Sequence, residues 1–227
     1  LASGSKPFDL SFFENEVVSI TGLIGSGKTT LASQIFGLDP NSKAKMTLNG
    51  NAYKPKSPKE AIAAGVFMCP KDRASNAVVS EFDISNNLAL PFLKRHSRLS
   101  FLRSKSLAQN ARNSIDKLGI VCQSEMDSVT TLSGGNQQKV MVGRWLAEES
   151  SVLLLDEPFQ GVDIKARRDI GLQIRSTSSQ RATLIFVAEL DEALEIADRV
   201  IVLHEGNLVG EYQNKRKNIP EIVSSFS

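Results

Sequence analysis

The chain reads Gly22-Leu23-Ile24-Gly25-Ser26-Gly27-Lys28-Thr29 directly after a β-branched run, and this order predicts a phosphate-binding loop. Residues 16–21 have the composition of a strand, and residues 29–36 have that of a helix. Glycines allow a tight turn that brings backbone amides close to an anion, and the helix N-terminus adds partial positive charge. We therefore expect Lys28 to reach the β- and γ-phosphates of a nucleotide and Thr29 to ligate Mg²⁺.

Two adjacent carboxylates follow a strongly apolar run. Residues 151–155 are continuously apolar after Ser151, as expected of a strand that is buried on both faces of a parallel sheet. Asp156 and Glu157 come at its carboxyl end, which is the edge where open α/β sheets bind ligands. We expect Asp156 to hold Mg²⁺ and Glu157 to orient and polarise the water that attacks the γ-phosphate. An acidic loop after a core strand has the same composition, so this interpretation depends on the glycine loop upstream.

A third segment, Ser133-Gly134-Gly135, precedes a predicted helix over residues 137–147. A serine hydroxyl and two residues without side chains at a helix start make an N-cap and an anion site. Taken alone, the segment is equally consistent with a capped helix that has no ligand.

Together these segments resemble the ATPases of the ABC type. The string Leu-Ser-Gly-Gly-Asn-Gln-Gln-Lys at residues 132–139 is similar to the ABC signature. The resemblance implies an α/β P-loop NTPase fold of ABC type, with a mixed or parallel sheet core and a helical subdomain. In ABC proteins the signature closes over ATP that is bound to the opposite domain of a head-to-tail dimer. It therefore implies a second ATPase cassette as a partner.

Three strings narrow the resemblance to the second ATPase domain of bacterial monosaccharide importers of the ribose, galactose and xylose type. They are residues 132–139, residues 156–163 and Pro-Lys-Asp-Arg at residues 70–73. In that family two cassettes share one polypeptide and power sugar import through transmembrane permease subunits, at the cytoplasmic face of the membrane, with a substrate-binding protein on the other side. The implied ligands are ATP and Mg²⁺, and the implied nucleotide-binding residues are Gly22, Leu23, Ile24, Gly25, Ser26, Gly27, Lys28, Thr29, Thr30, Ser133, Gly134 and Gly135.

The chain departs from the general ABC pattern at two positions. Glu189 follows the predicted strand of residues 183–187, where many ABC ATPases place a switch histidine, and Lys71 stands at the position of the Q-loop glutamine. The second cassette of the sugar family commonly lacks the histidine too, so Glu189 joins Glu157 as a candidate catalytic residue and predicts a weak or inactive site. That family often has arginine in place of Lys28, so the lysine here favours retained nucleotide binding. Two alternatives stay open: an ATP-binding regulatory cassette with little turnover of its own, and an importer of a nucleoside or a signalling sugar.

Composition sets further limits. A net charge of +2 on 227 residues gives no reason to expect a nucleic-acid partner, and a cassette acting in translation or DNA repair is expected to carry a long basic insertion or a coiled-coil arm that this sequence lacks. No apolar stretch approaches the ~20 residues that span a bilayer, so we expect any membrane association to come through a partner. Cys69 and Cys122 are expected to be reduced, buried thiols. His96 and His204 are expected in surface or turn positions.

The order of patterns along the chain predicts its organisation. Strand and helix signals alternate up to residue 68 and resume at residue 151. We predict a nucleotide-binding α/β core of residues 1–71 and 131–227, and a helical subdomain of residues 72–130. The subdomain contains an apolar stripe formed by Leu107, Ala111, Ile115 and Leu118.

Both ends of the chain carry further signals. A hairpin is expected around Gly206-Asn207, and a strand is expected over residues 8–12 with Phe8 in the core. This leaves no aromatic residue assigned to stack on adenine. The absence of an initiator methionine leads us to expect a longer parent polypeptide.

Overall fold

The computed structural model describes residues 7–72, 78–98 and 101–225, and its contacts divide the chain into two compact units. The first unit comprises Leu1–Met68, Ser150–Glu157 and Ser178–Ser227. The second comprises Cys69–Glu149 and Pro158–Thr177. The second unit therefore takes in residues that we assigned to the α/β core, and the boundaries of the functional helical subdomain stay a prediction.

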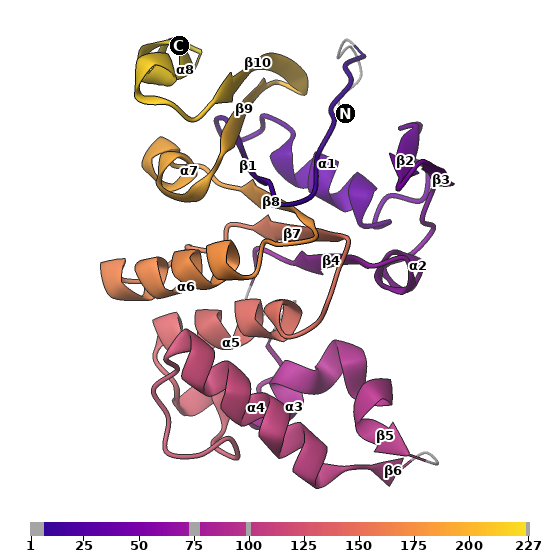
Figure 1. The fold of residues 1–227 in the computed structure, drawn as a ribbon, viewed down its shortest axis with the longest axis vertical. Coiled ribbons are helices and arrows are strands. Elements are labelled where there is room, and N and C mark those ends of the chain that lie inside the picture. Colours follow the sequence, from indigo (N-terminus) through magenta and orange to yellow (C-terminus); the bar gives the residue numbers. More distant parts are fainter. Residues whose placement is uncertain (1–6, 73–77, 99–100, 226–227) are drawn as a thin grey trace. The chain divides into compact units, whose positions relative to one another are not determined.

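The first unit is built on a six-stranded mixed sheet with the strand order β10-β9-β1-β8-β7-β4 (Figure 1). Strand β1 pairs in parallel with both β8 and β9, β7 pairs in parallel with β8, and β10 runs antiparallel to β9. This arrangement confirms the predicted α/β fold and the predicted hairpin. The strands are β1 (Val17–Thr21), β4 (Val66–Cys69), β7 (Val152–Asp156), β8 (Ala182–Phe186), β9 (Arg199–His204) and β10 (Asn207–Gln213).

Helices cover the sheet on both sides. Figure 1 shows α1 (Lys28–Ile35) and α7 (Leu190–Ile196) on opposite sides of it. The described part of the unit also contains α2 (Pro58–Ala63), α8 (Ile219–Ser224) and an antiparallel pair formed by β2 (Met46–Leu48) and β3 (Asn51–Tyr53). Because both faces are covered, β1 and β8 are buried along their whole length, and their mostly apolar sequences do not alternate with exposed polar residues.

The strand expected over residues 8–12 is wrong, although its apolar residues do face the core. Phe8, Leu10 and Phe12 pack against the main hydrophobic cluster of the first unit, while the residues between them are exposed. The alternation is that of a strand, but this segment forms no ladder with a neighbouring strand. Alternating burial reports which side chains face the core, and it does not require a pairing partner.

The second unit is mainly helical. Its helices are α3 (Ile84–Ala89), α4 (Ser104–Leu118), α5 (Gly134–Leu146) and α6 (Ile164–Ser176), with short 3₁₀ segments at Leu90–His96 and Val129–Thr131. Two short strands, β5 (Ser97–Arg98) and β6 (Phe101–Leu102), form an antiparallel pair. The predicted stripe on α4 is confirmed: Leu107, Ala111 and Leu118 are buried, and Ile115 packs against the same core.

The structure confirms the predicted placement of one histidine and one cysteine and differs from the prediction for the other two residues. His204 is exposed at the end of β9 and Cys69 is buried, as predicted, whereas Cys122 is only half-buried. The surface position expected for His96 is wrong. Its ring is buried with Nδ1 3.0 Å from the Ser106 Oγ atom, because the 3₁₀ segment ends against the first turn of α4. Burial and the nearby Arg95 charge lower the pKa of His96.

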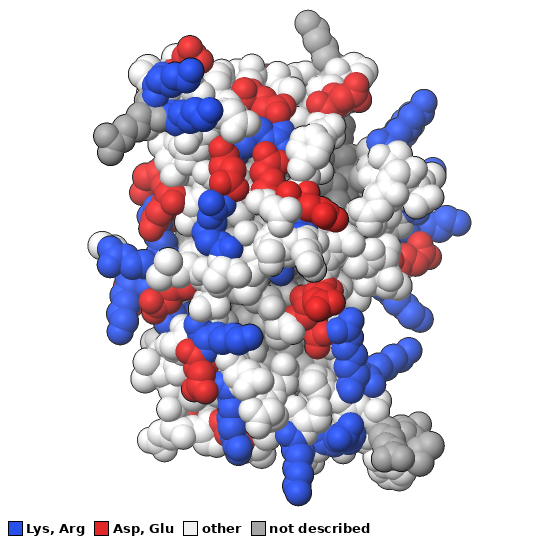
Figure 2. All heavy atoms as spheres, in the orientation of Figure 1, with Lys and Arg blue, Asp and Glu red and all other residues white. Residues whose placement is uncertain are grey.

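Charged side chains of both signs are scattered over the visible face (Figure 2), in keeping with a formal net charge of +2. Within the described residues, no helix has the length and apolarity needed to cross a bilayer.

A buried polar pair ties α5 to α3. Arg144 Nε donates to the Asn87 carbonyl oxygen at 2.6 Å, and an Arg144 terminal nitrogen donates to Asn87 Oδ1 at 3.2 Å. Asn87 Nδ2 in turn lies within 3.1 Å of the carbonyl oxygens of Val79, Phe82 and Asp83. Burial lowers the pKa of Arg144 to about 10, because the interior disfavours its charged form.

We predict that Asn87→Ala lowers the free energy of unfolding of the chain by about 3 kcal/mol, because it takes away a hydrogen-bond partner of a buried guanidinium and leaves several backbone groups unsatisfied. Urea unfolding followed by circular dichroism measures this loss. The control is Asn113→Ala on the exposed face of α4, which is expected to change stability by no more than about 0.5 kcal/mol. Similar losses in the two variants would contradict the structural role of Asn87.

Candidate functional site

The glycine loop lies at the carboxyl end of β1, between β8 and β9. Its glycines adopt backbone conformations that other residues rarely adopt, with φ of +147° at Gly22, +85° at Gly25 and +97° at Gly27. A β-carbon added to Gly22 would lie only 2.0 Å from the carbonyl oxygen of Leu203 in β9. The loop therefore requires glycine at this position both for its conformation and for its close approach to a neighbouring strand.

The Lys28 side chain turns back into the loop. Its ammonium group donates to the Gly22 carbonyl oxygen and lies 3.4 Å from both the Leu23 carbonyl oxygen and Ser26 Oγ. Lys28 is buried even though its head group is charged. A buried ammonium group held by loop oxygens lies where it can reach an anion that the loop encloses.

The start of α1 presents polar groups without a side-chain cap. Its N-cap is Gly27, which carries no side chain that could accept a hydrogen bond from the first turn. Thr29 and Thr30 are exposed in that first turn. The helix start thus combines uncapped amides with exposed hydroxyls, a combination suited to an anion and to a hard cation beside it.

The two carboxylates come at the end of β7 on the same sheet. Asp156 is the last residue of the strand, lies opposite Phe186 in the ladder and is 2% exposed. Glu157 has a left-handed backbone with φ of +50°, and its N–H donates to the Phe186 carbonyl oxygen at 2.8 Å. Backbones of this kind in residues other than glycine occur preferentially at functional sites. Nothing in the Asp-Glu dipeptide predicted this conformation.

The parallel pairing brings the predicted residues of the first unit to one edge of the sheet. The loop follows β1, Glu157 follows β7 and Glu189 follows β8, and all three strands run in the same direction. Glu189 is exposed at the N-cap of α7, and its side chain makes no capping hydrogen bond.

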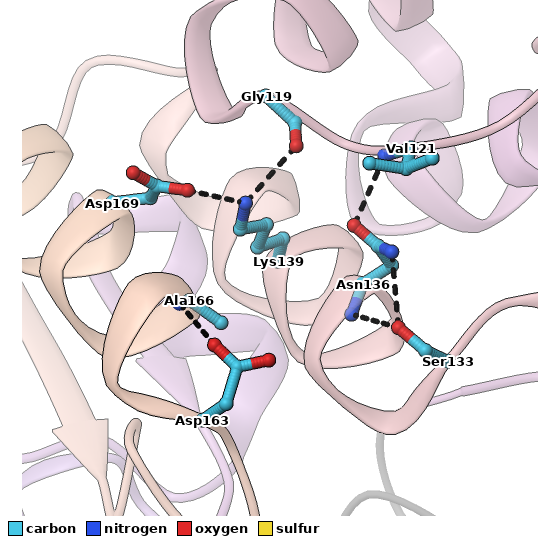
Figure 3. Close-up of polar contacts among 8 residues, drawn as sticks. All are labelled: Gly119, Val121, Ser133, Asn136, Lys139, Asp163, Ala166 and Asp169. Atoms are coloured by element: carbon cyan, nitrogen blue, oxygen red, sulfur yellow. Dashed lines mark hydrogen bonds and ion pairs between the residues drawn. The ribbon is translucent and has the colours of Figure 1, made fainter.

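The Ser133-Gly134-Gly135 segment belongs to the second unit. Ser133 is the N-cap of α5, as the sequence predicted, and its Oγ accepts from the backbone N–H of Asn136 at 3.4 Å (Figure 3). A β-carbon on Gly135 would lie 3.2 Å from the Ala166 β-carbon of α6, so the absence of a side chain allows the two helices to pack closely. The serine is exposed, as a ligand contact requires.

Two further side chains hold α5 in place, and sequence reasoning did not find their roles. Lys139 Nζ forms an ion pair with Asp169 Oδ2 of α6 at 2.7 Å and donates to the Gly119 carbonyl oxygen at 3.0 Å (Figure 3). Gln138 Nε2 donates to the Pro158 carbonyl oxygen at 2.9 Å. In the sequence these residues contribute only to the family resemblance of residues 132–139, because their hydrogen bonds are long-range contacts that the string itself does not specify.

Comparison with known proteins establishes the family. A family model described as ABC transporter matches residues 5–160, which include the glycine loop, the Ser-Gly-Gly segment and both carboxylates. The chain belongs to the ABC transporter family.

The relatives of this ABC cassette include sugar-import proteins. It is 37% identical over 218 residues to the ribose import ATP-binding protein RbsA 2 of Rubrobacter xylanophilus, covering 96% of this chain and 42% of that protein. It is 33% identical over 219 residues to the galactose/methyl galactoside import ATP-binding protein MglA of Fusobacterium nucleatum, covering 95% and 44%. The cassette thus spans less than half the length of the relatives that it matches.

Solved structures agree on the fold. The cassette matches the dimeric structure of MJ0796, a bacterial ABC transporter cassette, with a TM-score of 0.78 at 20% identity, covering 93% of this chain and 90% of that one. A nucleotide-free ATP-binding cassette from an ABC transporter matches with a TM-score of 0.79 at 20% identity, covering 95% and 87%. At this level of identity the likeness shows the fold alone.

The Pro-Lys-Asp-Arg string of residues 70–73 is described only in part. Lys71 and Asp72 lie just beyond the end of β4 in the second unit, and both are exposed. Arg73, the last residue of the Pro-Lys-Asp-Arg string, lies outside the described residues.

We predict different stability losses for two alanine substitutions in the glycine loop. Gly22→Ala and Gly25→Ala both place a β-carbon on a left-handed backbone, which costs roughly 1–2 kcal/mol. A β-carbon at Gly25 meets nothing within 4 Å, whereas one at Gly22 meets the backbone of β9. Gly22→Ala is therefore expected to lower the free energy of unfolding by about 2 kcal/mol more than Gly25→Ala does, as measured by urea unfolding. Equal losses would show that the close approach to Leu203 does not constrain the loop.

Proposed function

We propose that this cassette binds and hydrolyses ATP to power the import of a small sugar through a membrane permease. The observation that carries this proposal is the glycine loop with a buried lysine at the same sheet edge as Asp156 and Glu157. The names of the relatives, which are import proteins for ribose and galactose, support the choice of cargo.

In this proposal the loop amides and Lys28 bind the phosphates of ATP. The exposed Thr30 and the uncapped amides of the first turn of α1 add further donors. The Lys28 ammonium group exchanges its hydrogen bonds to the loop oxygens for bonds to phosphate oxygens. Because it is already buried, little additional desolvation accompanies this exchange.

The oxygen donors present fit Mg²⁺. Thr29 at the start of α1 and Asp156 at the end of β7 would hold the cation, and hydroxyl and carboxylate oxygens are ligands that Mg²⁺ prefers. No group of three or more His, Cys, Asp or Glu side chains suited to a metal occurs among the described residues, in keeping with a cation bound largely through substrate phosphates. When bound, the cation would neutralise charge on the phosphates.

Glu157 is the proposed general base. Its carboxylate accepts a hydrogen bond from the attacking water and orients it towards the γ-phosphate. The left-handed backbone, held by the hydrogen bond from Glu157 N–H to the Phe186 carbonyl oxygen, sets the direction in which this side chain leaves the sheet.

The proposed partners are a second ATPase cassette, permease subunits and, indirectly, a substrate-binding protein. Ser133, Gly134 and Gly135 would complete the second cassette's ATP site in a head-to-tail pair. Placement of that second cassette in the same polypeptide is supported by the coverage of the relatives, because more than half of each relative lies outside the match. The proposed location is the cytoplasmic face of the membrane, through the permease.

We predict that Lys28→Ala weakens binding of Mg-ATP by at least tenfold, because it removes a charge-assisted contact to the phosphates worth about 1.5–3 kcal/mol. Titration with a fluorescent ATP analogue measures the change. Lys217→Ala, an exposed lysine far along the sequence, is the control and is expected to bind as the wild type does. Equal affinities for wild type and Lys28→Ala would exclude the proposed nucleotide site.

A second candidate function is an ATP-binding regulatory cassette with little turnover of its own. Glu189 favours it, because a carboxylate stands where a histidine would donate a hydrogen bond to the developing negative charge. Import of a nucleoside or a signalling sugar is the alternative for the cargo. Uptake of labelled ribose, galactose and a nucleoside by cells that carry the assembled transporter would separate these cargoes.

We predict that Glu189→His raises the ATP turnover of this chain's own site about tenfold, equivalent to about 1.4 kcal/mol of transition-state stabilisation. The measurement uses the assembled transporter with the partner cassette's catalytic glutamate disabled. Adding Glu157→Gln is expected to remove the gain. A rate that stays unchanged, or a gain that survives Glu157→Gln, would mean that the missing histidine does not limit this site.

A further inference from the structure

Asn136 lies in the first turn of α5, and both the oxygen and the nitrogen of its side-chain amide form hydrogen bonds (Figure 3). Its Oδ1 accepts from the backbone N–H of Val121 at 3.0 Å, and its Nδ2 donates to Ser133 Oγ at 3.0 Å. The Asn136 backbone N–H also approaches Ser133 Oγ at 3.4 Å. One side chain therefore links the segment after α4 to the serine at the start of α5.

The Val121 contact decides which way the amide points. A backbone N–H only donates, so the atom of Asn136 that faces Val121 must be the oxygen. The atom that faces Ser133 is then the nitrogen, which only donates. Ser133 Oγ consequently acts as an acceptor towards Asn136.

This assignment determines which hydrogen bond the Ser133 hydroxyl can still make with another molecule. A hydroxyl has two acceptor positions and one proton. Asn136 occupies the acceptor positions with its side-chain and backbone N–H groups. Among the described residues the structure shows no acceptor for the Ser133 proton, and the serine is exposed.

We propose that Asn136 is a positioning residue that turns the Ser133 hydroxyl into an outward-facing donor for a phosphate oxygen of the ATP held by the partner cassette. The inference rests on the proposed function and adds to it a residue that acts through Ser133. Phosphate oxygens only accept, so a serine whose proton is turned inward would present lone pairs to the phosphate and repel it.

The test compares Asn136→Asp with Asn136→Ala in the assembled transporter. Glu157→Gln in this chain silences its own site, so the measured ATP turnover comes from the partner site. Asn136→Asp replaces the donor by an acceptor and draws the Ser133 proton inward, and we expect turnover to fall at least tenfold. Asn136→Ala only frees the hydroxyl to rotate, and we expect a fall of about threefold.

A double-variant cycle separates positioning from charge and from folding. Ser133→Ala alone is expected to lower turnover about tenfold. Adding Asn136→Asp to Ser133→Ala is expected to lower it by no more than about twofold, because the hydroxyl through which Asn136 acts is gone. Gln123→Glu, which adds the same charge at an exposed position of the second unit, is expected to leave turnover at the wild-type level.

Two controls monitor the chain itself. In Asn136→Ala the ATP affinity of its own P-loop is expected to stay unchanged, and the unfolding midpoint is expected to fall only slightly, because the Val121 N–H is on an exposed residue that water can reach. This variant keeps the test valid if Asn136→Asp folds poorly. The inference would be overturned if the turnover losses of Ser133→Ala and Asn136→Asp multiplied in the double variant. It would also be overturned if both Asn136 variants kept the wild-type turnover. Either result would leave the proposed function standing. No ATP turnover in the assembled transporter, or no effect of Ser133→Ala, would overturn the proposed pairing and the inference with it.

Discussion

The parallel pairing of β1 with β8 and β9 is the constraint on which the candidate site depends. Strands that run in one direction end at one edge, so the segments after β1, β7 and β8 must emerge there together. The close approach of Gly22 to the Leu203 carbonyl oxygen then sets how near the loop passes to β9. This geometry supports the proposed phosphate site, because loop amides, the Lys28 ammonium group and two carboxylates share one edge.

The second unit holds the Ser133-Gly134-Gly135 segment. Here the serine at the start of α5 is held by Asn136, and the helix is held by the partly buried ion pair between Lys139 and Asp169. Close packing at Gly135 brings α5 and α6 together, and Asp163 caps α6 by accepting from the Ala166 N–H. In the proposed head-to-tail pair, the exposed Ser133 on this anchored helix would face the nucleotide of the second cassette.

Sequence reasoning succeeded where chemistry is local. The glycine loop, the Ser133 N-cap and the strand that ends at Asp156 were predicted from spacing and composition, because each depends on residues within one or two turns. It was wrong for residues 8–12 and for His96. In both cases the outcome depended on what the segment packs against, which neighbours in sequence do not specify. The roles of Lys139 and Asn136 were missed for the same reason.

The sequence by itself predicted the phosphate-binding loop and the acidic pair, because each is encoded by residue types at short spacings, and its resemblance to the ABC ATPases predicted the family. Only the tertiary structure decided that Glu157 adopts a left-handed backbone, that the Lys28 ammonium group lies inside the loop, and that the Asn136 amide points its nitrogen at Ser133. Each of these depends on a hydrogen bond or a close contact whose direction is set by the folded chain: the Phe186 carbonyl, the loop carbonyls and the Val121 amide. The strength of a hydrogen bond depends on the orientation of its donor and acceptor, and groups that are distant in sequence take up that orientation only when the chain has folded.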